Sequence, residues 1–190
     1  MYKKNKDTKF LNNKKTLYFW DKTSNYMRIR RAETEEIDVI MRVFDAAKQF
    51  MRKTGNEKQW VDGYPSKEFI LNNIRDHGLY VCLSDDGQIV GVFYFKIEAD
   101  PTYAQIYDGE WLNDKPYGVV HRIASNGMQK RIGDACLQWC FEQCGNIRVD
   151  THRDNTVMQN VLLRNDYRRC GIICVANGTE RIAYQKTKTP

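Results

Sequence analysis

The amino-acid sequence predicts an α/β domain built on a mixed sheet that is flanked by helices. Its apolar residues alternate between strand and helix spacing in the order β-α-α-β-β-β-α-β-α-β-β. Asp85-Asp86-Gly87 separates two strand-like runs and predicts a hairpin in the first half of the chain. A strand, a loop and a helix span residues 117–144 and precede a strand at 147–151, which predicts a parallel crossover.

The first half of the chain is expected to hold one strand, two helices and this hairpin. Residues 27–31 have the pattern of a short strand. A helix over 34–53 follows, with Thr34 as its N-cap and Gly55 just beyond its end. Ser66 begins the second helix, whose sequence is KEFILNNIRDHG.

The second half is expected to hold two helices between strands. The segment DPTYAQIYDGEWLNDKP connects the hairpin to the strand YGVVHRIAS. The helix GDACLQWCFEQCG is expected to bury one face, formed by Ala135, Leu137, Cys140, Phe141 and Cys144. Asp154 or Asn155 begins the last helix, and the strands RRCGIICVAN and TERIAYQK close the chain as a hairpin.

The composition is that of a globular protein with one hydrophobic core. The chain has 190 residues, of which 42% are hydrophobic and 12% aromatic. No run reaches the ~18 consecutive apolar residues that a membrane span needs. The first residues also lack the apolar block and cleavage site of a signal peptide. We therefore expect a cytoplasmic protein that does not contact a membrane.

Positive charge is concentrated at the N-terminus. Residues 1–26 contain seven Lys and two Asp, whereas the whole chain carries a net charge of +6. We expect residues 1–26 to form a flexible basic leader, separate from a domain over 27–190. Contact between the leader and nucleic acid is the alternative. Because the remainder is close to neutral, a nucleic-acid-binding protein is not the favoured interpretation.

The cysteines have no spacing that is typical of a metal site. They are Cys82, Cys136, Cys140, Cys144, Cys170 and Cys174. No two form a CxxC pair, so the sequence predicts no metal site. We expect most of them to pack in the core, since an unpaired cysteine behaves as a small hydrophobic residue. Metal binding or redox chemistry is the alternative.

The loop that leads into the third predicted helix is the first candidate binding site. Its sequence, SNGMQKRIG, covers residues 125–133 and includes Lys130, Arg131 and Gly133. The first turn of a helix has unpaired N–H groups and the positive end of the helix dipole, so it attracts phosphate. A helix start with two solvated bases is the alternative. The chain has neither GxxxxGK[ST] nor GxGxxG, which excludes a P-loop and a dinucleotide-binding fold.

The order of the elements, together with this loop, resembles the GNAT superfamily of N-acetyltransferases over residues 27–187. In that family a strand, a (Q/R)xxGx(G/A) loop and a helix hold the pyrophosphate of acetyl-CoA. The segment VVHRIASNGMQKRIGDACLQW has this spacing, although only Gly133 matches when RIG is aligned with the family's GIG. A shifted alignment gives Lys130-x-x-Gly133-x-Ala135. The resemblance implies that acetyl-CoA is bound by Ile123, Ala124, Met128, Gln129, Lys130, Arg131, Ile132, Gly133, Asp134 and Asn155.

Two further segments carry the resemblance. IRVDTHRDNTVMQNVLLRNDYRRCGI is similar to the later part of the family fold, where Asn155 takes the position that hydrogen-bonds the pantetheine arm. A helix cap is the other interpretation of Asn155. GNEKQWVDGYP is similar to the loop that forms a wall of the acceptor site. This implies that Gln59, Trp60 and Tyr64 bind the acceptor, with structural packing of Trp60 and Tyr64 as the alternative.

Acetyl transfer to an amine also needs a group that removes a proton from the amine. The candidates are His121, Glu98 and Glu110, and we favour His121 and Glu110. The family's usual acid is a tyrosine seven residues after the motif asparagine, where this chain has Leu162. Tyr167 is the substitute candidate for that acid.

The resemblance therefore implies an acetyl-CoA-dependent N-acetyltransferase that acts on a primary amine by direct attack. Its acceptor is a small molecule or a peptide, it needs no metal, and a homodimer is a common assembly in the family. The alternative is a catalytically silent acyl-CoA sensor, which the altered glycine motif and the missing tyrosine favour. Acetyl-CoA binding without turnover would distinguish the two.

Overall fold

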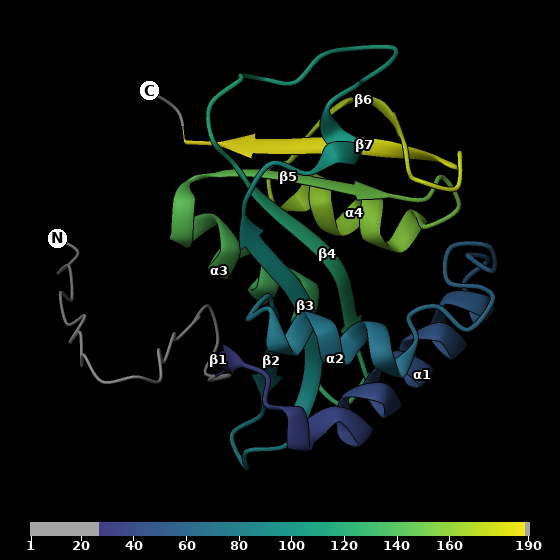
Figure 1. The fold of residues 1–190 in the computed structure, drawn as a ribbon, viewed down its shortest axis with the longest axis vertical. Helices are drawn as coiled ribbons and strands as arrows, with labels where there is room; N and C mark the ends of the chain where they lie inside the picture. The colour runs from purple at the N-terminus through teal and green to yellow at the C-terminus, as the bar shows by residue number, and fades with distance from the viewer. Residues whose placement is uncertain (1–26, 189–190) are drawn as a thin grey trace, which may run out of the picture.

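The structure is a computed structural model that describes residues 27–188 (Figure 1). Its seven strands are β1 (Arg28–Arg31), β2 (Leu79–Leu83), β3 (Ile89–Ile97), β4 (Gly118–Ser125), β5 (Asn146–Thr151), β6 (Arg168–Cys174) and β7 (Glu180–Thr187). They form one sheet in the order β1-β2-β3-β4-β5-β7-β6. Only β4 and β5 pair in parallel. The predicted mixed, mostly antiparallel sheet and the predicted crossover are confirmed, whereas the predicted leader, residues 1–26, lies outside the described residues.

Four α-helices flank this sheet in the predicted order. They are α1 (Ile37–Lys53), α2 (Lys67–Arg75), α3 (Ile132–Cys144) and α4 (Thr156–Arg164). Short 3-10 helices precede α1 (Thr34–Glu36) and follow β3 (Pro101–Tyr103). In Figure 1, α2 crosses in front of β3. In the chain, α3 follows β4 and α4 follows β5.

The two faces of the sheet carry separate halves of the core. Phe44 of α1 and Ile70 of α2 are buried together with Val92 of β3. The next residue of β3, Phe93, points to the other face, where it is buried with Leu137 of α3. This alternation is the period-2 pattern of a strand that is covered on both faces.

The helix starts follow the sequence in two cases and differ in one. Ser66 accepts a hydrogen bond from the backbone of Phe69 at 3.2 Å, so its predicted role as a cap is confirmed. Asn155 likewise accepts from the backbone of Met158 at 3.0 Å. The prediction that Thr34 caps the first helix is wrong, because Thr34 lies inside the short 3-10 helix before α1, and the N-cap of that 3-10 helix is Glu33. The backbone N–H of Glu33 donates to the Glu36 carboxylate at 2.9 Å, which fixes the start one residue earlier.

The cysteines are unpaired, and most of them are buried. Cys82, Cys136, Cys140 and Cys170 lie in the interior, whereas Cys144 is partly exposed and Cys174 is exposed. Within residues 27–188, no cluster of three or more His, Cys, Asp or Glu side chains is placed to hold a metal ion. None of the described helices is both long and apolar enough to span a membrane.

The position where β4 and β5 separate determines where a site can form. The two strands pair only from Gly118–Ile147 to Val120–Val149, although β4 continues to Ser125. On its other edge β4 keeps its pairing with β3, with a register shift between the pairs Val92–Ala124 and Tyr94–His121. Arg122 has a φ of 55°, so the strand bends there. On the edge that faces β5, the residues of β4 after Val120 therefore border an opening instead of a paired strand.

Candidate active site

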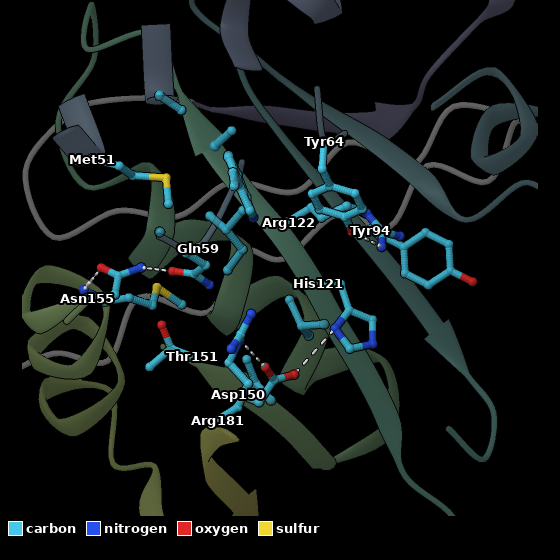
Figure 2. A pocket seen from close by; sticks show the side chains of 18 of the residues that line it. Met51, Gln59, Tyr64, Tyr94, His121, Arg122, Asp150, Thr151, Asn155 and Arg181 are labelled. Carbon is cyan, nitrogen blue, oxygen red and sulfur yellow. Dashed lines mark hydrogen bonds and ion pairs between the residues drawn. The ribbon is translucent and has the colours of Figure 1, made fainter. Parts of the chain in front are cut away.

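A cavity of about 1100 Å³ opens where β4 and β5 diverge (Figure 2). Its walls come from β4, the ends of α1 and β5, the start of α4, the loop before α2 and the turn between β6 and β7. Among the residues singled out from the sequence, the cavity is lined by Gln59, Trp60, Tyr64, Glu98, His121, Ile123, Ala124, Gly133 and Asn155. The opening thus brings residues of the predicted acceptor loop, strand and helix starts to one place.

His121 lies in this cavity with a carboxylate on each side of its ring. Its Nε2 is 2.8 Å from Oδ2 of Asp100, and its Nδ1 is 3.7 Å from Oδ1 of Asp150. Burial disfavours the charged form of Asp100, but hydrogen bonds from His121 and Thr102 outweigh it and lower its pKa to about 2. An ionised carboxylate only accepts hydrogen bonds, so Nε2 of His121 carries the proton. In the neutral ring, Nδ1 is then the basic nitrogen.

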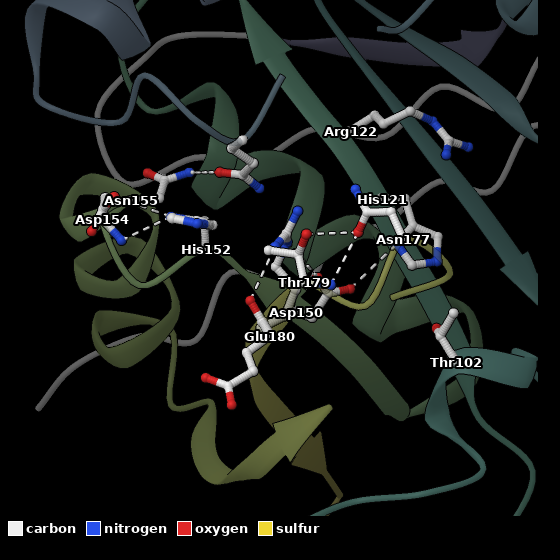
Figure 3. A network of polar contacts seen from close by, with 12 residues as sticks. Thr102, His121, Arg122, Asp150, His152, Asp154, Asn155, Asn177, Thr179 and Glu180 are labelled. Atoms are coloured by element: carbon white, nitrogen blue, oxygen red, sulfur yellow. Dashed lines mark hydrogen bonds and ion pairs between the residues drawn. The ribbon is translucent and has the colours of Figure 1, made fainter. Parts of the chain in front are cut away.

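Asp150 is held by a buried tyrosine. The hydroxyl of Tyr103 donates to Oδ1 of Asp150 at 2.8 Å. Burial, together with the charge of Asp150, raises the pKa of Tyr103 well above its usual range, so the phenol stays protonated and remains a donor. Figures 2 and 3 show Asp150 beside His121.

Asp100, Asp150 and Tyr103 were not identified from the sequence. Asp100 precedes Pro101 and Thr102, which is the pattern of a turn, and it does cap a short 3-10 helix. Nothing in that pattern indicates that its second oxygen faces a histidine on a strand 21 residues later. Alternation along β5 was the available signal for Asp150, since it is a charged residue inside a buried strand.

Arg122 joins the strand to the wall formed by α2. Its guanidinium donates to Asn73 at 2.6 Å and to the hydroxyl of Tyr64 at 3.3 Å. It also lies over the rings of Phe69 and Tyr94, with its Cζ atom 4.9 and 4.6 Å from the centroids. The predicted acceptor residue Tyr64 is therefore fixed to β4 through an arginine that the sequence did not single out.

Gln59 and Asn155 are directly hydrogen-bonded, although they lie 96 positions apart. Oε1 of Gln59 accepts from Nδ2 of Asn155 at 2.9 Å and from Nδ2 of Asn56 at 2.8 Å. Asn155 uses its own oxygen to cap α4, so the helix-cap interpretation of this residue is confirmed. Trp60 packs edge-on against Phe44, with ring centroids 5.7 Å apart, and also lines the cavity.

The loop between β4 and α3 ends at a residue in the left-handed backbone conformation, which glycine adopts most easily. Arg131, which the alignment places at a family glycine, has a φ of 65° and precedes the first turn of α3. Its side chain is exposed and lies 3.5 Å from Asp134. Gly133 lines the cavity, and a Cβ atom there would lie 3.2 Å from Cγ1 of Val161. A glycine at this position keeps the first turn of α3 accessible.

The other residues predicted for this loop have different surroundings. Met128 and Lys130 are exposed and Gln129 is partly exposed, but they lie outside the lining of the cavity. Ile132 is buried in the core. The Asp134 carboxylate is hydrogen-bonded to the end of α4, where Arg164 donates to it at 2.6 and 2.8 Å. Burial opposes the charge of Asp134, but these hydrogen bonds lower its pKa to about 2.

Two of the predicted catalytic residues do not meet His121. Glu110 is exposed in the segment between β3 and β4 and lies outside the cavity lining. Tyr167 is buried in the core on the α3 face, and burial raises its pKa well above its usual range. Glu98 does line the cavity, where it accepts a hydrogen bond from Tyr94 at 3.0 Å.

Solved structures with the same fold as this chain include acetyltransferases. Family models and curated protein sequences give no match. A GNAT-family acetyltransferase from Streptococcus agalactiae superposes with a TM-score of 0.81 and 32% identity, over 92% of this chain and 100% of that one. A GNAT-family acetyltransferase from Listeria monocytogenes shares the fold with a TM-score of 0.64 and 15% identity, over 85% of this chain and 94% of that one. A putative phosphinothricin N-acetyltransferase also shares the fold, with a TM-score of 0.59 and 13% identity, over 86% of this chain and 99% of that one. The chain therefore belongs to the GNAT family of acetyltransferases.

Proposed function

We propose that this protein transfers the acetyl group of acetyl-CoA to a primary amine by direct attack of the amine on the thioester carbonyl. The observation that carries the proposal is the position of His121. It lies in the cavity opened by the divergence of β4 and β5, with Asp100 on its Nε2 atom and its Nδ1 atom available to accept a proton. Family membership supports acetyl transfer in general terms, and this geometry supports the choice of an amine acceptor.

The loop before α3 fits the phosphates of acetyl-CoA. The first-turn N–H groups of α3 have no acceptor within the helix, and the helix dipole favours an anion there. The glycine-like backbone at Arg131 and the absence of a side chain at Gly133 leave room for a ligand to approach. Met128, Gln129, Lys130 and Arg131 would surround the phosphates, with positive charge from Lys130 and Arg131.

The side chains of Ile132 and Asp134 are turned into the protein, so these two residues would act only through their backbone N–H groups. The pantetheine arm would follow Ile123 and Ala124 on β4 toward Asn155, and all three line the cavity. Backbone N–H groups of β4 past Val120, where pairing with β5 ends, would polarise the thioester carbonyl.

His121 is the general base in this scheme. The amine gives its proton to Nδ1 of His121, its nitrogen forms the new bond to the carbonyl carbon, and the carbon–sulfur bond breaks. Asp100 acts as a positioning residue that fixes the ring and stabilises the imidazolium. The leaving group is a thiolate with a pKa of about 8.5 for an ordinary thiol, so solvent can protonate it. Glu110 and Tyr167 take no part in this scheme, because Glu110 is exposed between β3 and β4 and Tyr167 is buried in the core on the α3 face.

A catalytically silent acyl-CoA-binding module is the second candidate. It is favoured by Leu162, which is fully buried at the position where the family usually has its tyrosine acid. Such a protein would bind acetyl-CoA in the same loop and would not release CoA when an amine is added.

Three further expectations from the sequence stay proposals. We propose that residues 27–190 are the catalytic domain and that the basic leader over 1–26 is not needed for turnover. We also propose a cytoplasmic location. Light scattering of the purified chain would determine whether it forms the homodimer that its family membership suggests.

The experiment that tests the proposed function is a CoA-release assay. Full-length protein is mixed with acetyl-CoA and a panel of primary amines and amino-acid amines, and the free thiol is followed with a thiol reagent. We expect thiol release that depends on one class of amine and yields the acetylated amine by mass spectrometry. Acetyl-CoA binding without release by any amine would instead support the silent module.

A further inference from the structure

We propose that the acceptor carries a carboxylate as well as its amine, and that Arg181 at the start of β7 binds this carboxylate. The inference rests on the proposed function, since it names the acceptor class of the same cavity. Arg181 lines the cavity, yet its side chain is only 9% exposed. A guanidinium held in such a position without strong partners indicates a ligand with the opposite charge.

The contacts of Arg181 leave most of its donors without a protein acceptor. Among residues 27–188, the backbone oxygen of Glu180 accepts a hydrogen bond from its Nη1 atom at 3.0 Å. Its nearest carboxylate is Asp150, at 4.0 Å from Nε, which is too far for a hydrogen bond. A guanidinium has five N–H donors in a planar fork that matches a carboxylate. Burial lowers the pKa of Arg181 from its usual value, as expected for a cation that lacks full pairing.

Asp150 places Arg181 and His121 at the two ends of one short site. One oxygen of Asp150 faces His121 Nδ1 at 3.7 Å and the other faces Arg181 Nε at 4.0 Å. Figure 2 shows the two side chains on opposite sides of this carboxylate. A molecule with an amine and a carboxylate separated by one or a few carbons would therefore reach both. Its amine would lie at His121 and its carboxylate at Arg181.

The charges along this line suit such a zwitterion. Asp100 and Asp150 surround the His121 end and attract an ammonium group before it loses its proton. The Arg181 end offers positive charge, and Thr151 adds a buried hydroxyl that has no hydrogen-bond partner in the described part of the chain. Thr151 lines the cavity and is paired in the sheet with Ile182, the neighbour of Arg181. A simple monoamine would leave this polar end without a partner.

The turn between β6 and β7 borders the Arg181 end of the cavity. Val175, Ala176 and Asn177 of this turn line it. Oδ1 of Asn177 accepts hydrogen bonds from the backbone and the hydroxyl of Thr179, at 3.1 and 2.7 Å (Figure 3). The turn that leads into Arg181 is thus fixed by its own hydrogen bonds. The apolar side chains of Phe50, Met51 and Trp60 also line the cavity, so acceptors with apolar side chains are the best first probes.

The test compares amino acids with the amines formed by removing their carboxylate. The pairs are leucine and isopentylamine, methionine and 3-(methylthio)propylamine, and phenylalanine and phenethylamine, assayed by CoA release with full-length protein. We expect kcat/KM to favour the amino acid by about tenfold or more in at least one pair, which corresponds to one charge-assisted hydrogen-bonded contact. Arg181→Gln should reduce that ratio to near one by raising KM for the amino acid, while Arg181→Lys should restore part of it.

Arg168→Gln is the matched control, because Arg168 is exposed on β6 and lies outside the cavity. It should leave the ratio unchanged. Equal use of both members of every pair, or an equal loss for both in Arg181→Gln, would overturn the carboxylate inference and leave the N-acetyltransferase intact. If no amine is acetylated, calorimetric titration of the CoA-loaded protein with the amino acids still measures the Arg181 contact, and absence of binding overturns the inference. Failure to bind acetyl-CoA at all would reject the proposed function itself.

Discussion

The two sides of the cavity are built in different ways. On the proposed donor side, one continuous stretch supplies strand β4, the loop and the first turn of α3, and the groups available to a ligand belong mainly to the backbone. On the proposed acceptor side, His121, Asp100, Asp150 and Arg181 come from separate segments and meet only in the folded chain. The donor side should therefore tolerate changes of side chain that the acceptor side does not.

The largest effect is expected at His121. His121→Asn removes the base while keeping a polar side chain of similar reach, so kcat should fall by about 10²–10³-fold. The Kd for acetyl-CoA, measured by calorimetry, should stay within a factor of a few. His77→Asn is the control, because His77 is exposed and lies outside the cavity. A variant at His121 with nearly normal kcat would show that another group takes the proton.

The next effect is on stability and concerns the donor side. Asp134 is 1% exposed and accepts hydrogen bonds from Arg164 and Asn165, so Asp134→Ala should lower the free energy of unfolding by about 2 kcal/mol. Urea unfolding measures this change. Asp166→Asn is the control, since the Asp166 side chain is 88% exposed, its ion pair should contribute almost nothing, and asparagine tolerates the φ of 63° at this position.

The lowered pKa of Asp134 predicts that its contribution to the free energy of unfolding depends on pH. The pKa of Asp134 is about 2 in the folded state, below the ordinary 3.8 that it regains on unfolding. Its contribution is therefore fully present above about pH 4 and is lost as the pH falls toward 2. The difference in unfolding free energy between wild type and Asp134→Ala should shrink over that interval. A difference that stays constant would show that packing, and not the charge, is what the substitution removes.

A smaller effect is expected for the positioning residue Asp100. Asp100→Asn keeps the shape but lets the side chain offer an N–H toward the His121 ring, so kcat should fall by about tenfold. KM for acetyl-CoA should not change, which separates a role at His121 from general disruption of the cavity. Asp114→Asn, at an exposed aspartate between β3 and β4, should match wild type. An unchanged kcat in Asp100→Asn would remove this residue from the mechanism.

The smallest effect is expected at Arg131. Arg131→Gly preserves the left-handed backbone at this position, so the Kd for acetyl-CoA should change by less than about threefold. Arg131→Glu places a negative charge beside the phosphates and should weaken binding by about tenfold. Calorimetric titration gives both values. A large loss in the glycine variant would mean that the arginine side chain itself holds a phosphate.

The difference between the contiguous donor side and the dispersed acceptor side also explains which features could be predicted from the sequence. The element order depends on local periodicity, and this prediction is confirmed by the sheet and its crossover. Asn155 was recognisable because a helix cap is a local feature. The pairing of Asp100 with His121 depends on how the segment after β3 folds back, which local spacing does not determine.

Two details at helix ends depend on which neighbours are available. Thr34 has the side chain of a typical N-cap, but the carboxylate of Glu36 bonds back to Glu33, which caps the short 3-10 helix instead. Phe141 and Cys144 pack against the core as predicted, although they are only partly buried, toward the end of α3. Side-chain type alone does not report which neighbour is available in space.

Calorimetric titration of acetyl-CoA into full-length protein freed of bound CoA asks whether the loop before α3 holds the donor. The expected result is one site per chain with a micromolar Kd, weakened in Arg131→Glu and within a factor of a few of wild type in His121→Asn. No heat of binding up to millimolar acetyl-CoA would contradict it, because the loop before α3 would then not hold the donor on which every later step depends.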